Sequence, residues 1–470
     1  MKKEMRMETD SIGTMEVPKE AYYGVQALRA QQNFPISGTF LNSVFIQNLA
    51  KIKKAAAITN KKINWLDGKK AEAIIKACEE VIRGKFHEEF IVDAIQGGAG
   101  TSANMNMNEV IANRADELMG GARGRYSKVH PNDHVNMSQS TNDVIPTAGK
   151  LTVIDLAKEL ILELEELEKE LINKSVEFDD VLKMGRTQLQ DAVPMRVGQT
   201  FHAYASMISR DKKRIKNSMA EMYTLNLGGT AIGSGVNADA SYIENIVPCL
   251  VKITGYPLKQ AEDLFDATQN LDGFVMVSGV LKACAVNLSK MCNDLRLLSS
   301  GPKTGIGELY LPERQNGSSI MPGKINPVIP EVVNQVAFHV IGHDTTITLA
   351  AEAGQMELNA FEPIVFYNLF ESLSMLKQAV NTLTNHCIKG IRVNKERCYK
   401  MVNESAGIAT ALCPHIGYTK SAEIVKTALK TGKNVRTIVL ESGIMSEVAL
   451  ERALDPYAVT EWKEVREMLI

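Results

Sequence analysis

The segment Asn316–Glu331 concentrates side chains that could do chemistry. It carries the adjacent hydroxyls of Ser318 and Ser319, the ammonium of Lys324 and the amide of Asn326, together with two glycines and three prolines. Glycine allows backbone angles that other residues avoid, while proline fixes φ and removes a donor, so this composition predicts a loop of defined shape. The donors of such a loop could bind an anion.

Two other interpretations of this segment fit less well. A phosphate-binding loop has four residues between its first glycine and its Gly-Lys pair, but here five residues separate Gly317 from Gly323, and Ile325 follows Lys324 where Ser or Thr is needed. A rigid polar turn between helices would explain the glycines and prolines, but not the hydroxyls, ammonium and amide together. The segment is therefore a candidate for chemistry on an anionic substrate.

A second polar cluster contains the pattern Gly98-x-Gly100-x-x-Ala103. This spacing occurs in dinucleotide-binding turns, but those turns open the helix of a strand-helix-strand unit, and the chain offers helical patterns without alternating strands. A dinucleotide site is therefore disfavoured.

In the third cluster, Ser140, Thr141 and Asn142 are adjacent and lie directly before a long helical pattern. Side-chain donors beside the free N–H groups of a helix N-terminus make an anion site. Ordinary helix capping would account for one of these side chains, or two. The cluster therefore predicts an anion-binding helix N-terminus.

Long amphipathic helices must position these clusters, because apolar residues recur at spacings of three and four along much of the chain. One such pattern has some 30 residues, which corresponds to a helix about 45 Å long, and helices of that length indicate a bundle. The predicted helices are two between 47 and 83, the second capped by Gly84, one over 148–178, and three over 194–225, 264–298 and 328–389, the last broken or kinked at Pro363.

The fold class predicted from these patterns is mainly α. Residues 1 to about 45 are polar and irregular, and after Gly390 the patterns become short and are interrupted by proline and glycine. We therefore expect three domains: a mostly helical N-terminal domain over 1–140, a central long-helix bundle over 141–395 and a small C-terminal helical domain over 396–470.

Composition excludes several classes of protein. With 53 basic and 55 acidic residues, the net charge of -2 gives no basic footprint for nucleic acid or for an anionic membrane. The seven cysteines are scattered and never form Cys-x-x-Cys, so neither a disulfide framework nor a zinc site is indicated. The charged N-terminus lacks the apolar part of a signal peptide, and no run of about 18 apolar residues occurs. We expect a cytoplasmic protein that acts on small molecules.

The loop sequence Gly-Ser-Ser-x-Met-Pro-x-Lys-x-Asn-Pro, which ends at Pro327, resembles the signature loop of the aspartase/fumarase superfamily at every fixed position. Further resemblance lies in Gly97–Ser102, His134–Asp143, Met184–Pro194 and Gly228–Asn237, so it covers the whole chain. The segments Pro327–Glu331 and Ala351–Gln355 are more similar to the aspartate ammonia-lyases of that superfamily than to its fumarases. The resemblance implies a three-domain fold around a helical bundle, a homotetramer, and active sites shared by three subunits.

The same resemblance gives roles to residues. It implies that Ser318 accepts a proton from the substrate and that Thr101 contacts a substrate carboxylate. Gln188 departs from the histidine that many relatives carry, and we expect its amide to orient the substrate's amino group or a carboxylate. The full set of expected substrate-binding residues is Thr101, Ser140, Thr141, Asn142, Thr187, Gln188, Ser319, Lys324 and Asn326.

Release of ammonia from aspartate requires removal of a weakly acidic proton beside a carboxylate, which builds a doubly charged aci-carboxylate. Hydroxyls and amides aimed at that charge stabilise it by about 3–4 kcal/mol each. Serine is a poor base unless nearby donors or positive charge stabilise its alkoxide. The reaction itself needs no metal or organic cofactor, and we find no His/Cys/Asp cluster with the spacing of a catalytic metal site.

Two alternatives to an aspartate ammonia-lyase stay open. A fumarate hydratase or another fumarate-producing lyase of the superfamily is one, although Gln188 cannot supply the proton that a leaving hydroxide needs. A catalytically inactive structural protein of the same fold is the other. The presence of Ser318, Lys324 and Asn326 disfavours it.

Overall fold

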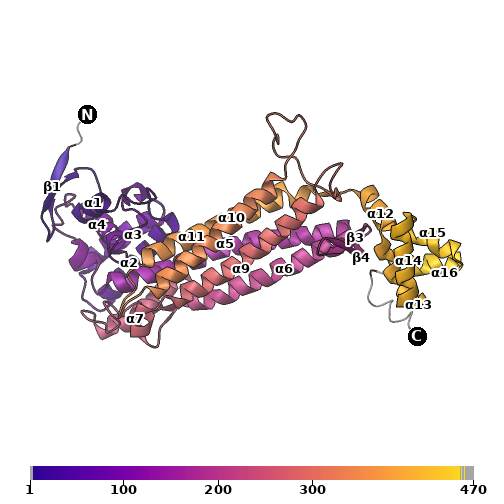
Figure 1. Cartoon of the computed structure of the whole chain (residues 1–470). Helices are drawn as coiled ribbons and strands as arrows, with labels where there is room; N and C mark the ends of the chain where they lie inside the picture. Colours follow the sequence, from indigo (N-terminus) through magenta and orange to yellow (C-terminus); the bar gives the residue numbers. More distant parts are fainter. Residues whose placement is uncertain (1–3, 456, 458–459, 461–470) are drawn as a thin grey trace. The chain divides into compact units, whose positions relative to one another are not determined.

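The computed structural model describes residues 4–455, 457 and 460, and it is mainly helical, as predicted (Figure 1). The chain forms two compact units. Unit 1 contains the described residues up to Ile161 together with Lys213–Ala285 and Phe338–Lys377, and unit 2 contains Leu162–Lys212, Val286–Ala337 and the described residues from Gln378 onward. The division into three domains at residues 140 and 395 stays a prediction, and residues 461–470 of its last domain lie outside the described residues.

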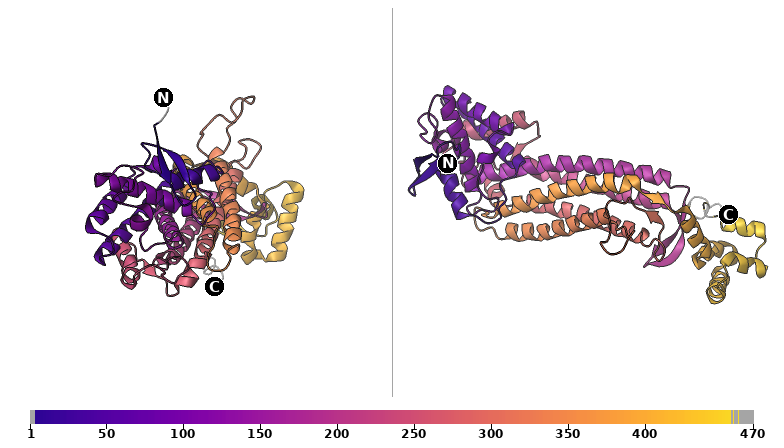
Figure 2. Two further views of the ribbon diagram at one scale, coloured as in Figure 1. Left: turned by 90° about the vertical axis from the view of Figure 1, so that its left-hand side faces the viewer. Right: turned by 90° about the horizontal axis from the view of Figure 1, so that it is seen from above.

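Long helices dominate both units and confirm the predicted bundle. Each of five helices contributes a segment to each unit, and within a unit these segments run side by side (Figures 1 and 2). Their apolar residues at spacings of three and four face inward, as Leu164, Leu167 and Leu171 show by their complete burial. The five helices are α5 (Thr141–Glu177), α6 (Val197–Ser218), α9 (Asp272–Leu298), α10 (Val328–Glu352) and α11 (Glu362–His386).

The N-terminal part of unit 1 contains the two helices that were predicted between residues 47 and 83. Gly84 ends the second of them as expected, because its φ of 89° lets its N–H donate to Val81 O at 2.9 Å. The hairpin and helix that precede this pair were not predicted, since both are short. The elements are β1 (Met5–Thr9) paired antiparallel with β2 (Thr14–Pro18), α1 (Val25–Asn33), α2 (Ser43–Lys62), α3 (Gly68–Ile82), η1 (His87–Glu89), α4 (Thr101–Leu118) and a π-helical turn η2 (Pro131–Val135).

Three predicted helices differ from the observed ones. The pattern over 328–389 is interrupted by residues 353–361, and Pro363 lies in the first turn of α11, where a missing N–H costs nothing, so it begins a helix rather than kinking one. The pattern over 264–298 is divided into α8 (Leu264–Gln269) and α9. The pattern over 194–225 begins in a strand, and α6 is followed by η3 (Met219–Tyr223) and by a second short strand over 224–225.

The remaining elements are short. In unit 1, β5 (Thr224–Leu225) pairs in parallel with β6 (Lys259–Gln260), and α7 (Ala240–Thr254) lies between them in sequence. Unit 2 adds two antiparallel pairs and a C-terminal group of helices whose core includes Leu412, Ile424 and Leu450. These elements are β3 (Leu182–Thr187) with β4 (Gln190–Arg196), β7 (Leu309–Tyr310) with β8 (Arg392–Val393), η4 (Ile388–Gly390), α12 (Lys395–Glu404), η5 (Ala406–Leu412), α13 (Cys413–Ile416), α14 (Tyr418–Thr431), α15 (Val435–Glu441) and α16 (Glu447–Ala453).

Helix α9 is the one described helix that is long and apolar enough to cross a membrane by length and composition. Half of its most apolar window is buried inside the protein. A core helix of a bundle meets the same criterion, because its apolar side chains face its neighbours.

Candidate active site

The first part of the site lies where the N-termini of α4 and α5 meet in unit 1. Asn104 of α4 donates from Nδ2 to Thr141 Oγ1 of α5 at 3.1 Å. Thr101 is three residues before Asn104, so it projects from the same face of α4. The two helices also pack closely, because a Cβ on Gly100 would lie 2.8 Å from the side chain of Ile145. Two positive helix ends and several hydroxyls therefore gather in one place, as an anion site requires.

A capping box fixes the start of α5. The N–H of Asn142 donates to Ser140 Oγ at 3.2 Å, and the N–H of Ser140 donates to Asp143 Oδ1 at 3.0 Å. Asp143 Oδ2 also accepts the N–H groups of Gly228 and Thr230 at 3.0 and 3.2 Å. One buried carboxylate therefore ties the predicted anion site to the glycine-rich loop over 228–237.

Asn142 also connects the start of α5 to the glycine-rich loop and its surroundings. Its Nδ2 donates to Ala231 O at 2.7 Å, and its backbone oxygen accepts from Asn226 Nδ2 at 2.9 Å. The structure therefore gives Asn142 a positioning role, and its expected contact with substrate stays a prediction. The sequence did not reveal Asn226, because only the tertiary fold brings it to α5.

A network of buried polar side chains lies next to the N-termini of α4 and α5. Lys53 of α2 is completely buried and donates to Asn136 Oδ1 at 2.9 Å, and the same oxygen accepts from Asn104 and Asn108 at 3.2 Å. Burial lowers the pKa of Lys53 to about 7 and raises the pKa of Asp143 to about 6. Lys53 was not predicted as a buried residue, although its place between apolar helix positions could have indicated burial.

The second part of the site is the Ser318 loop, residues 316–326 of unit 2. Ser318 Oγ accepts the N–H groups of Ile320 at 3.2 Å and of Met321 at 3.0 Å. Two donors on one hydroxyl oxygen favour its negatively charged form, which is the condition for serine to act as a base. Ser319 is exposed and has no such pair of donors among the described residues. The structure thereby separates two serines that sequence alone could not distinguish.

The loop closes on itself at its neck. The N–H of Gly317 donates to Lys324 O at 2.9 Å, and Asn326 Nδ2 donates to Gly317 O at 3.0 Å. A Cβ on Gly317 would lie 2.3 Å from Lys324 O, so only glycine fits there. The side chain of Ile320 at the tip is 84% exposed, and Lys324 is also exposed. The loop therefore has a fixed neck and an unpacked tip.

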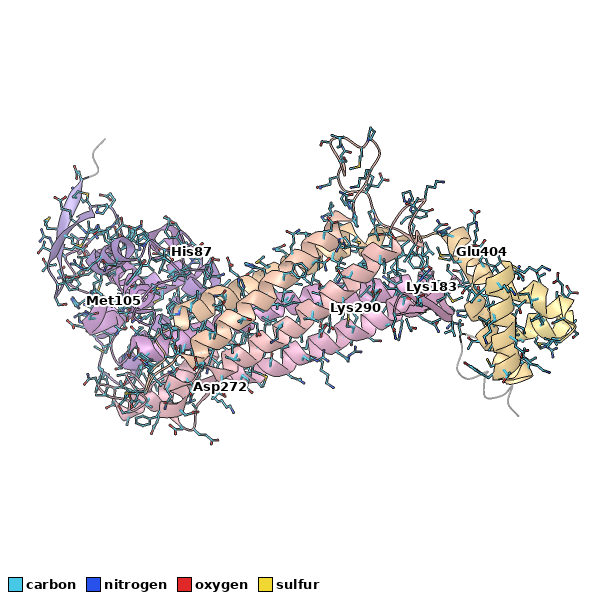
Figure 3. The ribbon with its side chains drawn as sticks, in the orientation of Figure 1. His87, Met105, Lys183, Asp272, Lys290 and Glu404 are labelled. Atoms are coloured by element: carbon cyan, nitrogen blue, oxygen red, sulfur yellow. The ribbon has the colours of Figure 1, made fainter. Side chains whose placement is uncertain are left out.

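Thr187 and Gln188 lie at the tip of the hairpin formed by β3 and β4. Gln188 and Leu189 form its two-residue turn, and both have positive φ, 53° and 62°. Such turns normally use Asn-Gly, so this one stores strain, and strained residues concentrate at functional sites. Lys183 of β3, labelled in Figure 3, forms an ion pair with the completely buried Glu308 at 3.3 Å. The hairpin was not predicted, because its strands lie in a short polar stretch.

The expected residues therefore fall into two groups. Unit 1 contains Thr101, Ser140, Thr141 and Asn142, and the Thr101 hydroxyl donates to Gly98 O at 2.7 Å. Unit 2 carries the other six candidates: Thr187, Gln188, Ser318, Ser319, Lys324 and Asn326. Among the described residues, no hydrogen bond or ion pair joins the hairpin tip to the Ser318 loop.

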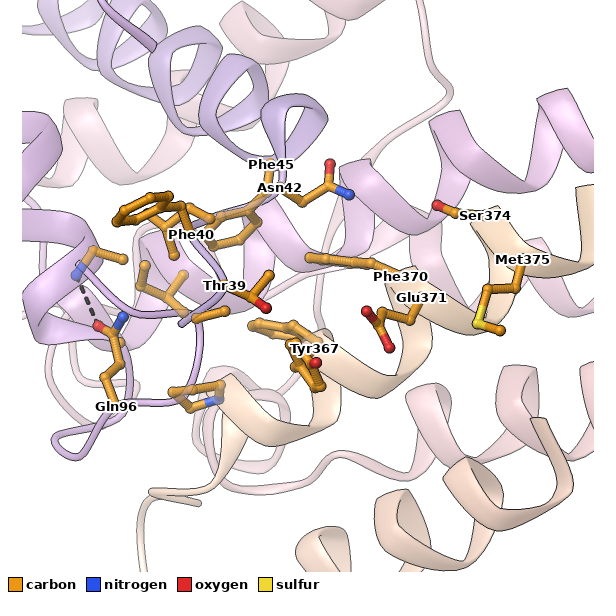
Figure 4. A pocket seen from close by; sticks show the side chains of 17 residues that line it. Thr39, Phe40, Asn42, Phe45, Gln96, Tyr367, Phe370, Glu371, Ser374 and Met375 are labelled. Atoms are coloured by element: carbon orange, nitrogen blue, oxygen red, sulfur yellow. Dashed lines mark hydrogen bonds between the residues drawn. The ribbon is translucent and has the colours of Figure 1, made fainter. Parts of the chain in front are cut away.

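An apolar cavity of about 260 Å³ lies in unit 1 but does not suit a dicarboxylate (Figure 4). Apolar side chains from several parts of the chain line it, and these include the aromatic rings of Phe40, Phe45 and Phe370. Ser140, Thr141 and Asn142 do not line it. We therefore do not place the substrate there.

Comparisons with known proteins identify the family of the chain. The family described as "Lyase" matches residues 13–342, and the one described as "Fumarase C C-terminus" matches residues 408–461. The chain is 51% identical over 460 residues to an aspartate ammonia-lyase of Bacillus sp, which covers 98% of each protein. It is 53% identical over 454 residues to an aspartate ammonia-lyase of Pseudomonas aeruginosa, and this alignment covers 96% of each protein.

A solved structure gives the same result for the fold. The fumarate lyase:delta crystallin from Brucella melitensis bound to cobalt is 48% identical to the chain, with a TM-score of 0.95, over 97% of this chain and all of that one. The predicted fold is therefore confirmed. By its sequence, its fold and its signature segments, the chain belongs to the aspartase/fumarase superfamily of lyases.

Proposed function

We propose that the chain is an aspartate ammonia-lyase, which converts L-aspartate reversibly to fumarate and ammonia. Relatives with about half of their residues identical over nearly their whole length have that activity in their names. The observation that carries the proposal is the environment of Ser318, whose hydroxyl oxygen accepts two backbone N–H groups within the signature loop. An inactive structural protein would not need this arrangement.

The reaction begins when the Ser318 alkoxide removes a proton from the carbon beside one substrate carboxylate. The electron pair of that C–H bond moves into the carboxylate and forms the aci-carboxylate. When the C–N bond breaks, this pair forms the double bond of fumarate, and ammonia leaves. Thr101, Ser140, Thr141 and Ser319 are suited to stabilise the added charge, and Lys324, Asn326 and Thr187 are suited to hold the other carboxylate.

The active site is composite in this proposal. Its candidate residues are divided between two compact units, and the superfamily resemblance implies a homotetramer in which three subunits contribute to each site. The enzyme works in the cytoplasm on small-molecule substrates. Its Ser318 loop acts as a lid, which its exposed tip and its glycine-containing neck support.

A substrate panel tests the proposed activity. Fumarate formation from L-aspartate, L-malate and argininosuccinate should be measured side by side with the purified protein. We expect turnover of aspartate to exceed that of the other two substrates by orders of magnitude. Faster turnover of malate would identify a fumarate hydratase instead, and no turnover of any substrate would indicate a structural protein.

Complementation tests the composite site. Ser318→Ala and Thr101→Ala subunits, each nearly inactive, should be unfolded, mixed and refolded together. Hybrid tetramers should regain activity well above either parent, because some sites then combine two intact contributions. Hybrids that form without regained activity would mean that each site belongs to one chain.

A further inference from the structure

A cluster of potential metal ligands lies on α10 and α11 within unit 1, and it contains none of the residues assigned to the reaction. His339, His343 and Glu371 each offer one ligand atom, and these atoms all lie within 4.8 Å of one another. His339 Nε2 is 3.9 Å from Glu371 Oε2, and the rings of the two histidines have their centroids 4.1 Å apart. The two histidines were not predicted as a site. Their spacing, His339-Val-Ile-Gly-His343, places both imidazoles on one helix face.

Hydrogen bonding orients the second histidine for a metal. Ser372 Oγ donates its single proton to Asn368 O at 2.7 Å, so it must accept at its 2.9 Å contact with His343 Nδ1. The proton of His343 therefore sits on Nδ1, which leaves the lone pair of Nε2 free. A ligand histidine whose other nitrogen donates to a fixed acceptor is the common arrangement in metal sites.

The donor set indicates the kind of ion. Two imidazoles and one carboxylate suit Zn²⁺ and similar first-row divalent ions, whereas Mg²⁺ and Ca²⁺ prefer oxygen ligands. In a tetrahedral zinc site the ligand atoms lie about 3.3 Å apart, so rotation of the partly exposed His339 and Glu371 side chains would close the present spacing. Their exposure also allows water to complete the coordination.

We propose that His339, His343 and Glu371 bind one divalent transition-metal ion, which links α10 to α11. The two helices are separated in sequence by residues 353–361, so the ion would join two consecutive helices. Glu371 also lines the apolar cavity (Figure 4). A bound ion should stabilise the fold, since the unfolded chain does not hold the three ligands together.

Equilibrium dialysis of the whole protein against Zn²⁺, without aspartate, tests this proposal. The wild-type protein should bind one ion per chain, and His339→Gln, His343→Gln and Glu371→Gln should each lose it. Ser372→Ala should weaken binding by about tenfold, because His343 then loses the acceptor that orients it. Zn²⁺ should raise the melting temperature of the wild-type protein but not of the three ligand variants.

His202→Gln is the matched control, since His202 is an exposed histidine on α6. This variant should bind Zn²⁺ as the wild type does. The Co²⁺ complex should lack the intense near-ultraviolet band of a cobalt thiolate, which separates this site from binding by the free cysteines. Absence of a bound ion in the wild type, or equal binding by wild type and His343→Gln, would overturn the proposal.

Discussion

The anion site in unit 1 and the Ser318 loop in unit 2 use the same kinds of side chain in opposite ways. At the start of α5, hydroxyls and amides are locked by a capping box and by the completely buried Asp143. In the Ser318 loop, the hydrogen bonds stay within the loop, and its tip is exposed. If the proposed function holds, the first region is preorganised to bind charge, and the second acts as a lid that carries the proton acceptor.

The largest expected effect comes from the Ser318 hydroxyl of that loop. Ser318→Ala should lower kcat for aspartate by about 10³-fold or more, because the variant has no proton acceptor. KM and the free energy of unfolding should change little, since the serine contacts only its own loop. Steady-state kinetics and urea unfolding measure both. Ser319→Ala is the control, and an equal loss of kcat in that variant would contradict the assignment of Ser318 as the base.

The preorganised region is tested by Thr141→Val. Thr141 Oγ1 accepts from Asn104 and so keeps its own proton for a substrate oxygen. We expect kcat/KM to fall by about 10²-fold, the usual effect of removing one donor aimed at developing charge. Thr147→Val is the matched control on the same helix, because the buried Oγ1 of Thr147 has no hydrogen-bond partner among the described residues. Equal kinetics of the two variants would show that Thr141 faces away from the substrate.

The neck of the loop gives a smaller effect that sharpens the comparison. In Gly317→Ala, the new methyl group would clash with Lys324 O and open the neck, so kcat/KM should fall by about tenfold while global stability is unchanged. Gly323→Ala meets no atom within 4 Å and carries only the strain of its φ of 79°. Kinetics and thermal unfolding of both variants would measure this. A larger kinetic defect in the Gly323 variant would mean that loop motion, not neck geometry, controls activity.

A separate test concerns the pH dependence of the free energy of unfolding, through the buried lysine next to the start of α4 and α5. Burial lowers the pKa of Lys53 to about 7, below its value in the unfolded chain, so the folded protein binds fewer protons between those values. The wild-type free energy of unfolding should therefore rise relative to that of Lys53→Met as pH increases from 7 toward 10, by about 1.4 kcal/mol per pH unit at most.

Urea unfolding of both proteins at several pH values measures this difference. Lys62→Met, an exposed change on the same helix, should follow the wild type. If the free energies of unfolding of wild type and Lys53→Met change with pH in parallel, Lys53 stays charged over the whole pH range measured. The buried network would then be more polar than its burial suggests.

The sequence by itself determined the helical class, the bundle and the Ser318 loop. Long helices keep their apolar residues at a spacing of three and four, and a loop built from fixed glycines and prolines needs few contacts with the rest of the chain. The positions of Ser140 and Thr141 at a helix N-terminus followed from local chemistry in the same way.

Only the tertiary structure decided which polar groups support one another. Lys53, Asn136 and Asp143 come from different segments, and a buried polar group is satisfied by partners that sequence spacing does not reveal. The same reason separates Ser318 from Ser319, since the turn directs two backbone N–H groups at one hydroxyl. The strained turn at Gln188 likewise depends on strand pairing, which overrides the preference of glutamine for negative φ.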